Sequence, residues 1–279
     1  MNESAPSSGP RRSVIAYGAI TYLVSWSWLA FLLSRGGYAA LGWVGPFVFM
    51  WAPGVCSLLC RLLFGEGFRD IGWGWRNWKA TLAAIWGPLI VGVPVYGVLW
   101  LTGLAPRTAH WPLYIYGAIL AVTVPILTPF SLGEELAWRG YLLDRLVKTG
   151  WMRPVFILGL IWAGWHLPLL VTGQYCTSSY PAVTVVLFVL MVLGFNAAIC
   201  RLRLRSGSIW VPVLMHSVHN AVFQNVLQPV TTDNQWHTLL GGECGVLTAL
   251  AYGLLAWLMW RQPKSTADTT SRNQPFGVA

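Results

Sequence analysis

Long stretches without Asp, Glu, Lys or Arg alternate along the chain with short polar segments. A membrane-spanning helix needs about 20 mainly apolar residues, and most of these runs are long enough for at least one. The runs cover residues 13–34, 36–60, 80–106, 111–130, 154–200, 206–232 and 244–260. The turn-rich segment from Gly173 to Pro181 divides the run at 154–200 into two. We therefore predict an all-α membrane protein with eight transmembrane helices.

The polar segments outside these runs predict the domain organisation. Residues 1–12 are small and polar and end in two arginines, and residues 262–279 are polar with Pro and Gly, so we expect both to be disordered tails. Residues 13–261 then form a single transmembrane domain. The tryptophan-rich stretch from Gly65 to Trp78 predicts a surface loop or a short helix that lies at the membrane interface.

Composition and charge support a membrane protein and indicate its orientation. Only 10% of the residues are charged and 56% are hydrophobic, whereas soluble proteins have roughly 25% charged residues. The net charge of +9 does not indicate nucleic-acid binding here, because the basic residues cluster between apolar runs. With the N-terminus inside, 15 basic residues are cytoplasmic and two, Arg35 and Arg107, are outside, with Arg139 set aside. This bias predicts two cytoplasmic termini, and the compact loops favour a multi-pass protein of a prokaryotic plasma membrane with lipids as partners.

The segment Ser131–Leu143 places two carboxylates and an arginine inside the apolar pattern. An ionisable residue at membrane depth costs at least about 2.5 kcal/mol, so a functional site is the default interpretation. In a helix, Glu135 and Arg139 share a face and are predicted to form an ion pair. Glu134 points about 100° away from that face and is left free for chemistry.

Pro129 and Gly133 bracket an expected break in the fourth span, just before the acidic pair. Such a break is tolerated at membrane depth where it lines a cavity in the protein. Alternatively, Ser131 and Glu134 form a capping box at the start of a new helix. Capping explains neither the second acid nor the arginine, and it does not exclude a chemical role.

Two further apolar runs carry polar side chains that suit hydrolysis. A lone histidine such as His166 is as readily explained as a hydrogen-bonded core residue. His216 and Asn220 are four residues apart and share a helix face, whereas His219 is rotated toward a neighbouring face. With Glu134, these groups supply a base for water, imidazoles that orient the water or bind a metal, and an amide for the oxyanion. Since no serine or cysteine lies in a nucleophile elbow, attack by activated water is favoured over an acyl-enzyme.

Three motifs, in this order and spacing, resemble those of the CPBP intramembrane proteases. This group includes the CAAX prenyl endopeptidases and the bacteriocin-processing or immunity proteins. The resemblance covers roughly residues 110–230, and the first three spans match only in hydropathy. The motifs are Glu134-Glu135-x-x-x-Arg139, Trp162-x-x-x-His166 and His216-x-x-x-Asn220.

The resemblance implies roles for the polar residues. Glu134 would be the base that activates water, and His166 would share that water. His216 and Asn220 would stabilise the oxyanion or complete the site. The family is labelled metalloprotease, so Glu134, His166 and His216 would be the ligands if a divalent metal such as zinc is bound. A metal-independent glutamate mechanism is the alternative.

The remaining motif residues have supporting roles by the same resemblance. Glu135 with Arg139 would hold the helix or the terminus of the substrate. Trp162 stands where the family usually has Phe, so we expect an altered pocket shape with the aromatic anchor retained.

The preferred hypothesis is an intramembrane endopeptidase that cuts a lipidated or membrane-anchored protein or peptide. We expect cleavage near the cytoplasmic half of the membrane, in a pocket open toward the cytosol. One alternative is a non-catalytic immunity or scaffolding protein of the same fold. Another is a proton-coupled transporter, although the sequence shows no pair of repeated halves with matching broken segments.

Five cysteines show no metal-finger spacing. Cys56 and Cys60 lie four apart in an apolar helix and are expected to be packing residues. Cys176 and Cys244 both face outward in the predicted topology, where a disulfide bond between them can form.

Overall fold

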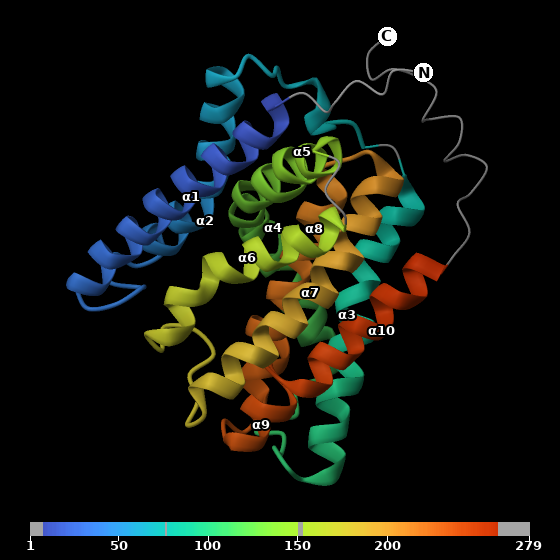
Figure 1. Cartoon of the computed structure of the whole chain (residues 1–279). Coiled ribbons are helices and arrows are strands. Elements are labelled where there is room, and N and C mark those ends of the chain that lie inside the picture. Colours follow the sequence, from blue (N-terminus) through green and yellow to red (C-terminus); the bar gives the residue numbers. More distant parts are fainter. Residues whose placement is uncertain (1–7, 76, 150–152, 262–279) are drawn as a thin grey trace.

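The structure is a computed structural model, and it describes residues 8–75, 77–149 and 153–261. The described residues are helical and contain no β-strand, apart from one isolated bridge between Arg107 and Thr231 (Figure 1). The α-helices are α1 (Ser8–Ser34), α2 (Val44–Leu63), α3 (Trp78–Thr102), α4 (Leu113–Ala137), α5 (Leu143–Lys148), α6 (Pro154–Val171), α7 (Pro181–Ser206), α8 (Trp210–Asn220), α9 (Gln235–Leu240) and α10 (Val246–Arg261). Short 3₁₀ and π segments complete the fold, namely η1 (Arg69–Ile71), η2 (Trp138–Leu142), η3 (Ala221–Leu227) and η4 (Gln228–Val230).

Six helices of the described chain are long and apolar enough to cross a membrane. They are α1, α2, α3, the continuous helix formed by α4, η2 and α5, then α6 and α7. The predicted seventh span corresponds to α8 followed by the π-helix η3, and the predicted eighth to α10, which has 16 residues. The all-α class is confirmed, whereas the count of eight spans and the orientation stay predictions. The predicted divide between the fifth and sixth spans is confirmed, because α6 ends at Val171 and α7 begins at Pro181.

The limits of the transmembrane domain differ slightly from the prediction. Helix α1 begins at Ser8, so residues 8–12 of the expected disordered tail are helical. Residues 1–7 and 262–279 of the two expected tails lie outside the described residues. The stretch from Gly65 to Trp78 contains the short 3₁₀ helix η1, and its position at the membrane interface stays a prediction.

The loops gather at two opposite ends of the molecule. At the first, which we call the arginine-rich end, Asp70 of η1 accepts hydrogen bonds from Arg61 of α2 at 2.5 Å and from Arg145 of α5 at 2.6 Å. At the second, which we call the disulfide end, the loop between α6 and α7 is joined to the loop between α9 and α10 by the Cys176–Cys244 bond. The predicted ability of these two cysteines to pair is thereby confirmed.

The arginine-rich end holds the irregular turn that follows the acidic motif. Burial raises the pKa of Asp70, but hydrogen bonds and charge from Arg61 and Arg145 outweigh it and hold the pKa below its usual value. Arg61 also donates to the backbone carbonyl of Gly140, and Arg203 donates to that of Arg139. Both carbonyls belong to the π-helix η2, where the regular helical hydrogen-bond pattern is disturbed. The arginines therefore satisfy backbone acceptors in this turn.

The fourth span is continuous where a break was expected. Helix α4 runs through Pro129 and Gly133, so the prediction of a break there is wrong, and the irregularity lies later, in η2. Because Ser131 lies inside this helix, the capping-box alternative is wrong as well. A Cβ atom on Gly133 would lie 2.8 Å from Cα of Trp51 in α2, so the glycine serves a close helix crossing instead of a break.

Candidate active site

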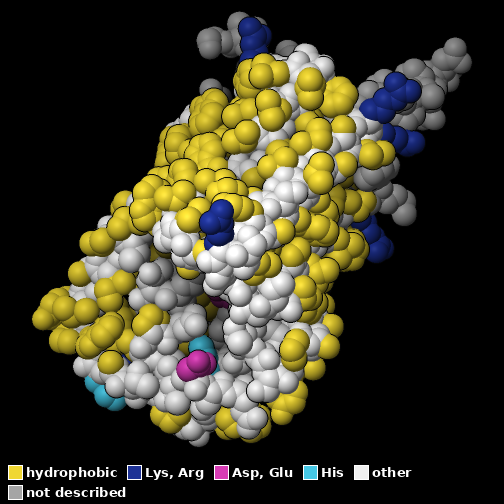
Figure 2. Space-filling model, turned by 90° about the vertical axis from the view of Figure 1, so that its left-hand side faces the viewer, with side chains coloured by type: hydrophobic (Ala, Val, Ile, Leu, Met, Phe, Trp, Pro, Cys, Tyr) yellow, Lys and Arg dark blue, Asp and Glu magenta, His cyan; other side chains and the backbone are white. Residues whose placement is uncertain are grey.

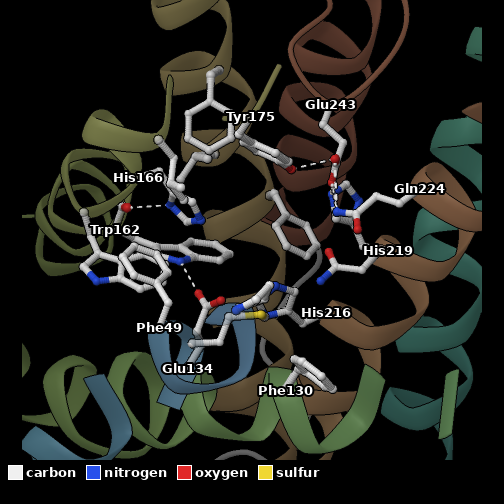
Figure 3. A pocket seen from close by; sticks show the side chains of 18 of the residues that line it. Phe49, Phe130, Glu134, Trp162, His166, Tyr175, His216, His219, Gln224 and Glu243 are labelled. Carbon is white, nitrogen blue, oxygen red and sulfur yellow. Dashed lines mark hydrogen bonds and ion pairs between the residues drawn. The ribbon is translucent and has the colours of Figure 1, made fainter. Parts of the chain in front are cut away.

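The predicted catalytic residues lie around one cavity of about 310 Å³. Glu134 comes from α4, His166 from α6, and His216 and Asn220 from α8, and all four line the cavity. Figure 3 shows Glu134, His166 and His216 around the same space, next to the indole of Trp162. Most of the remaining wall is aromatic or aliphatic, with further polar groups from Tyr175, His219, Gln224 and Glu243.

Glu134 is held by two indole groups through one of its oxygens. Its Oε2 accepts a hydrogen bond from Nε1 of Trp162 at 2.8 Å and from Nε1 of Trp138 at 3.2 Å. Among the described residues, no hydrogen bond reaches Oε1. The carboxylate is only 2% exposed, so its free oxygen can serve a molecule that enters the cavity.

Trp162 therefore does more than fill space. It stands at the position where the resembling family usually has Phe, and a phenylalanine ring has no N–H to donate. The guanidinium of Arg139 also lies over the ring of Trp162, 4.2 Å from the ring centroid. The expected aromatic anchor is present. The indole also donates a hydrogen bond to Glu134, which was not expected from the replacement of Phe by Trp.

Glu135 lies behind the cavity wall and forms the predicted ion pair. Its Oε1 accepts from Arg139 at 2.8 Å and lies 2.9 Å from Nδ1 of His216. Arg139 also donates to the amide oxygen of Asn196 on α7 at 2.9 Å. Glu135, Arg139 and Asn196 are fully buried, so this network connects α4, α7 and α8 and orients His216.

His166 and His216 each use Nδ1 in a hydrogen bond within the protein and leave Nε2 for a further partner. A carboxylate paired with arginine only accepts hydrogen bonds, so Nδ1 of His216 is the donor to Glu135. The backbone carbonyl of Trp162 likewise only accepts, so Nδ1 of His166, 3.0 Å away, carries a proton. In the neutral form of each ring, Nε2 is then a hydrogen-bond acceptor.

A second polar cluster in the cavity was missed by the sequence analysis. Glu243, in the loop before α10, lies 3.0 Å from Nε2 of His219 and accepts from Tyr175 at 2.5 Å. Gln224 donates to both oxygens of the same carboxylate at 3.2 Å. Tyr175 and Glu243 are direct sequence neighbours of the two bridged cysteines, Cys176 and Cys244. The pairing of these cysteines was the signal that could have brought the two polar residues together.

The residues do not fit the metal site that the resemblance implied. Within the described parts of the chain, no three His, Cys, Asp or Glu side chains converge as a metal ion requires. No chemical step is therefore assigned to a metal.

A comparison with protein families decides the relationship of the central segment. Residues 110–222 match the family model described as type II CAAX prenyl endopeptidase Rce1-like. This segment is similar to the Rce1-like family. None of the curated proteins compared with the chain has a significantly similar sequence. The matched segment includes all three motifs, whereas Gln224 and Glu243 lie beyond its end.

This similarity supports a CAAX-type intramembrane protease in general. Together with six apolar helices of membrane-spanning length, it indicates a multi-pass membrane protein.

Proposed function

We propose that the protein hydrolyses a peptide bond in a lipidated or membrane-anchored protein or peptide, with Glu134 as the general base. One observation carries this proposal. The free Oε1 of Glu134 borders a cavity that it shares with two imidazoles and a carboxamide from other helices. Those are the groups that hydrolysis by activated water needs, and the surrounding apolar wall suits an apolar anchor.

The reaction starts with a water molecule between Glu134 and the imidazoles. Oε1 of Glu134 removes a proton from the water as its oxygen attacks the carbonyl carbon of the peptide bond. The second hydrogen of the water is donated to the acceptor atom Nε2 of His166, which orients the water, and His216 completes this side of the site. The Asn220 amide donates to the oxyanion that forms on the carbonyl oxygen.

The second step breaks the carbon–nitrogen bond. Glu134 gives its proton to the departing amine nitrogen, the oxyanion collapses to a carboxylic acid, and the base is regenerated. One water molecule is consumed and two peptide fragments are released. Glu135 and Arg139 act on this reaction by holding His216 in place.

The test uses the purified full chain in detergent and a fluorescent peptide that carries a prenyl or acyl chain. We expect two fragments whose masses add up to the peptide plus one water, with the same rate in the presence of a chelator. His166→Ala should slow this cleavage by about 10² or more, whereas His110→Ala, at an exposed site outside the cavity, should not. Failure to cleave any anchored peptide, or loss of activity with chelator, would contradict the proposal.

A further inference from the structure

We infer that the substrate enters the cavity from the non-cytoplasmic side of the membrane, and that the enzyme acts on peptides or proteins anchored in the outer leaflet. This inference rests on the proposed function and adds the side from which the substrate comes. It replaces the expectation of a pocket open toward the cytosol. Four observations carry it: the cavity is closed at one end and open at the other, and both the basic residues and the disulfide bond indicate which end is cytoplasmic.

The cavity is closed toward the arginine-rich end. After Glu134 the chain continues from α4 into η2 toward this end, and the side chains of Trp138, Arg139 and Tyr141 there are fully buried. Beyond them, Arg61 and Arg145 are almost fully buried and joined through Asp70. None of these side chains lines the cavity. A packed layer of aromatic rings and ion pairs therefore separates Glu134 from this end.

The cavity reaches the loops of the opposite, disulfide end. Its wall includes Tyr38 from the loop between α1 and α2, Tyr175 from the loop between α6 and α7, and Glu243 from the loop before α10. Tyr38 and Tyr175 are partly exposed, in contrast to the buried Glu134. Figure 2 shows that the molecule is hollowed on the side of α1, α2 and α6. The route to Glu134 thus starts among the loops of this end.

The basic residues mark the closed end as cytoplasmic. Of the 17 Lys and Arg residues outside the motif, 15 fall in segments that the predicted topology places on one side. Arg61, Arg145 and Arg203 of this set meet around η1 at the arginine-rich end. Because cytoplasmic loops of membrane proteins carry the excess of Lys and Arg, the closed end faces the cytoplasm.

The disulfide bond gives the same orientation from different chemistry. Disulfides form and persist outside the cytoplasm, where thiols are not kept reduced. The Cys176–Cys244 bond joins two loops at the open end, directly beside Tyr175 and Glu243 of the cavity wall. The disulfide bond at the rim of the cavity therefore indicates that this end faces the oxidising, non-cytoplasmic side of the membrane. Charge and redox chemistry agree that the opening is non-cytoplasmic.

The experiment compares right-side-out with inverted membrane vesicles that contain the full chain. Met191→Cys places a thiol on the cavity wall, and Arg69→Cys places one on the exposed surface of the arginine-rich end. A charged, membrane-impermeant thiol reagent should modify Met191→Cys in right-side-out vesicles and Arg69→Cys only in inverted ones. The chain without added cysteine measures the background, since Cys56, Cys60 and Cys200 are buried. Reaction of Met191→Cys only in inverted vesicles, equally from both sides, or only in detergent would overturn the inference.

A second measurement on the same vesicles separates this inference from the proposed function. A lipidated peptide with a charged, impermeant head is added from outside, and its cleavage is followed before and after detergent. We expect at least tenfold faster cleavage by right-side-out than by inverted vesicles, and equal rates once detergent removes the barrier. Faster cleavage by inverted vesicles would overturn the inference. Absence of cleavage in detergent would instead contradict the proposed function, while the thiol labelling still decides the side.

Discussion

Glu134→Gln is expected to abolish proteolysis while leaving the fold intact. Glutamine keeps the shape of the side chain and an oxygen that can accept from the indoles of Trp138 and Trp162. It cannot take a proton from water, so both proton transfers of the proposed reaction lose their carrier. A general acid–base contributes about 10²–10⁴ to a rate, and we expect a loss in kcat of that size or larger.

The measurement is kcat and KM for an anchored fluorescent peptide, with thermal unfolding of the same preparation as the check on the fold. Glu66→Gln is the matched control, because it makes the same chemical change at the arginine-rich end, beside Arg145 and outside the cavity. We expect the control to stay within a few-fold of the unmodified chain. A Glu134→Gln protein that cleaves at the normal rate would exclude this residue as the base.

Arg139→Ala is expected to destabilise the protein as well as to inactivate it. Arg139 and Glu135 are both fully buried, and removal of one partner leaves an uncompensated charge. Such a loss costs roughly 3–5 kcal/mol in proteins. The change also removes the donor to Asn196 and the cation above the ring of Trp162. Because Glu135 orients His216, activity should fall in the protein that remains folded.

Chemical unfolding in detergent measures the stability of this variant. Arg35→Ala is the control, since its guanidinium lies over Phe31 at the exposed end of α1 and should cost little. Addition of Glu135→Gln to Arg139→Ala removes the unpaired charge and is expected to recover part of the stability. Normal stability of an inactive Arg139→Ala variant would show that the pair does not stabilise the fold and would assign Arg139 to substrate contact.

Local helix geometry made much of the candidate site predictable. Residues four apart share a helix face, so the pairing of Glu135 with Arg139 and the separate direction of Glu134 followed from spacing alone. The same reasoning placed His216 and Asn220 together on one wall of the cavity. The predicted break at Pro129 was wrong, because a membrane helix can continue through proline when neighbouring groups satisfy the backbone.

Contacts between segments far apart in the chain could not be predicted from the hydrophobic pattern and residue spacing. Glu243 reaches His219 only because the loop before α10 folds back over α8. The indole donor from Trp162 to Glu134 depends on how α6 packs beside α4. The direction in which the cavity opens depends on the packing of several helices at once, so no local sequence pattern predicts it.

The central claim is that the scissile bond lies beside Glu134 in the cavity. Photo-cross-linking tests it most directly, with the Glu134→Gln chain and an anchored peptide that carries a diazirine next to the cleaved bond. We predict that mass spectrometry finds the label on cavity-wall segments of α4, α6 and α8, around residues 127–134, 162–169 and 216–220. Labels confined to the arginine-rich end or to the outer faces of the helices would contradict it.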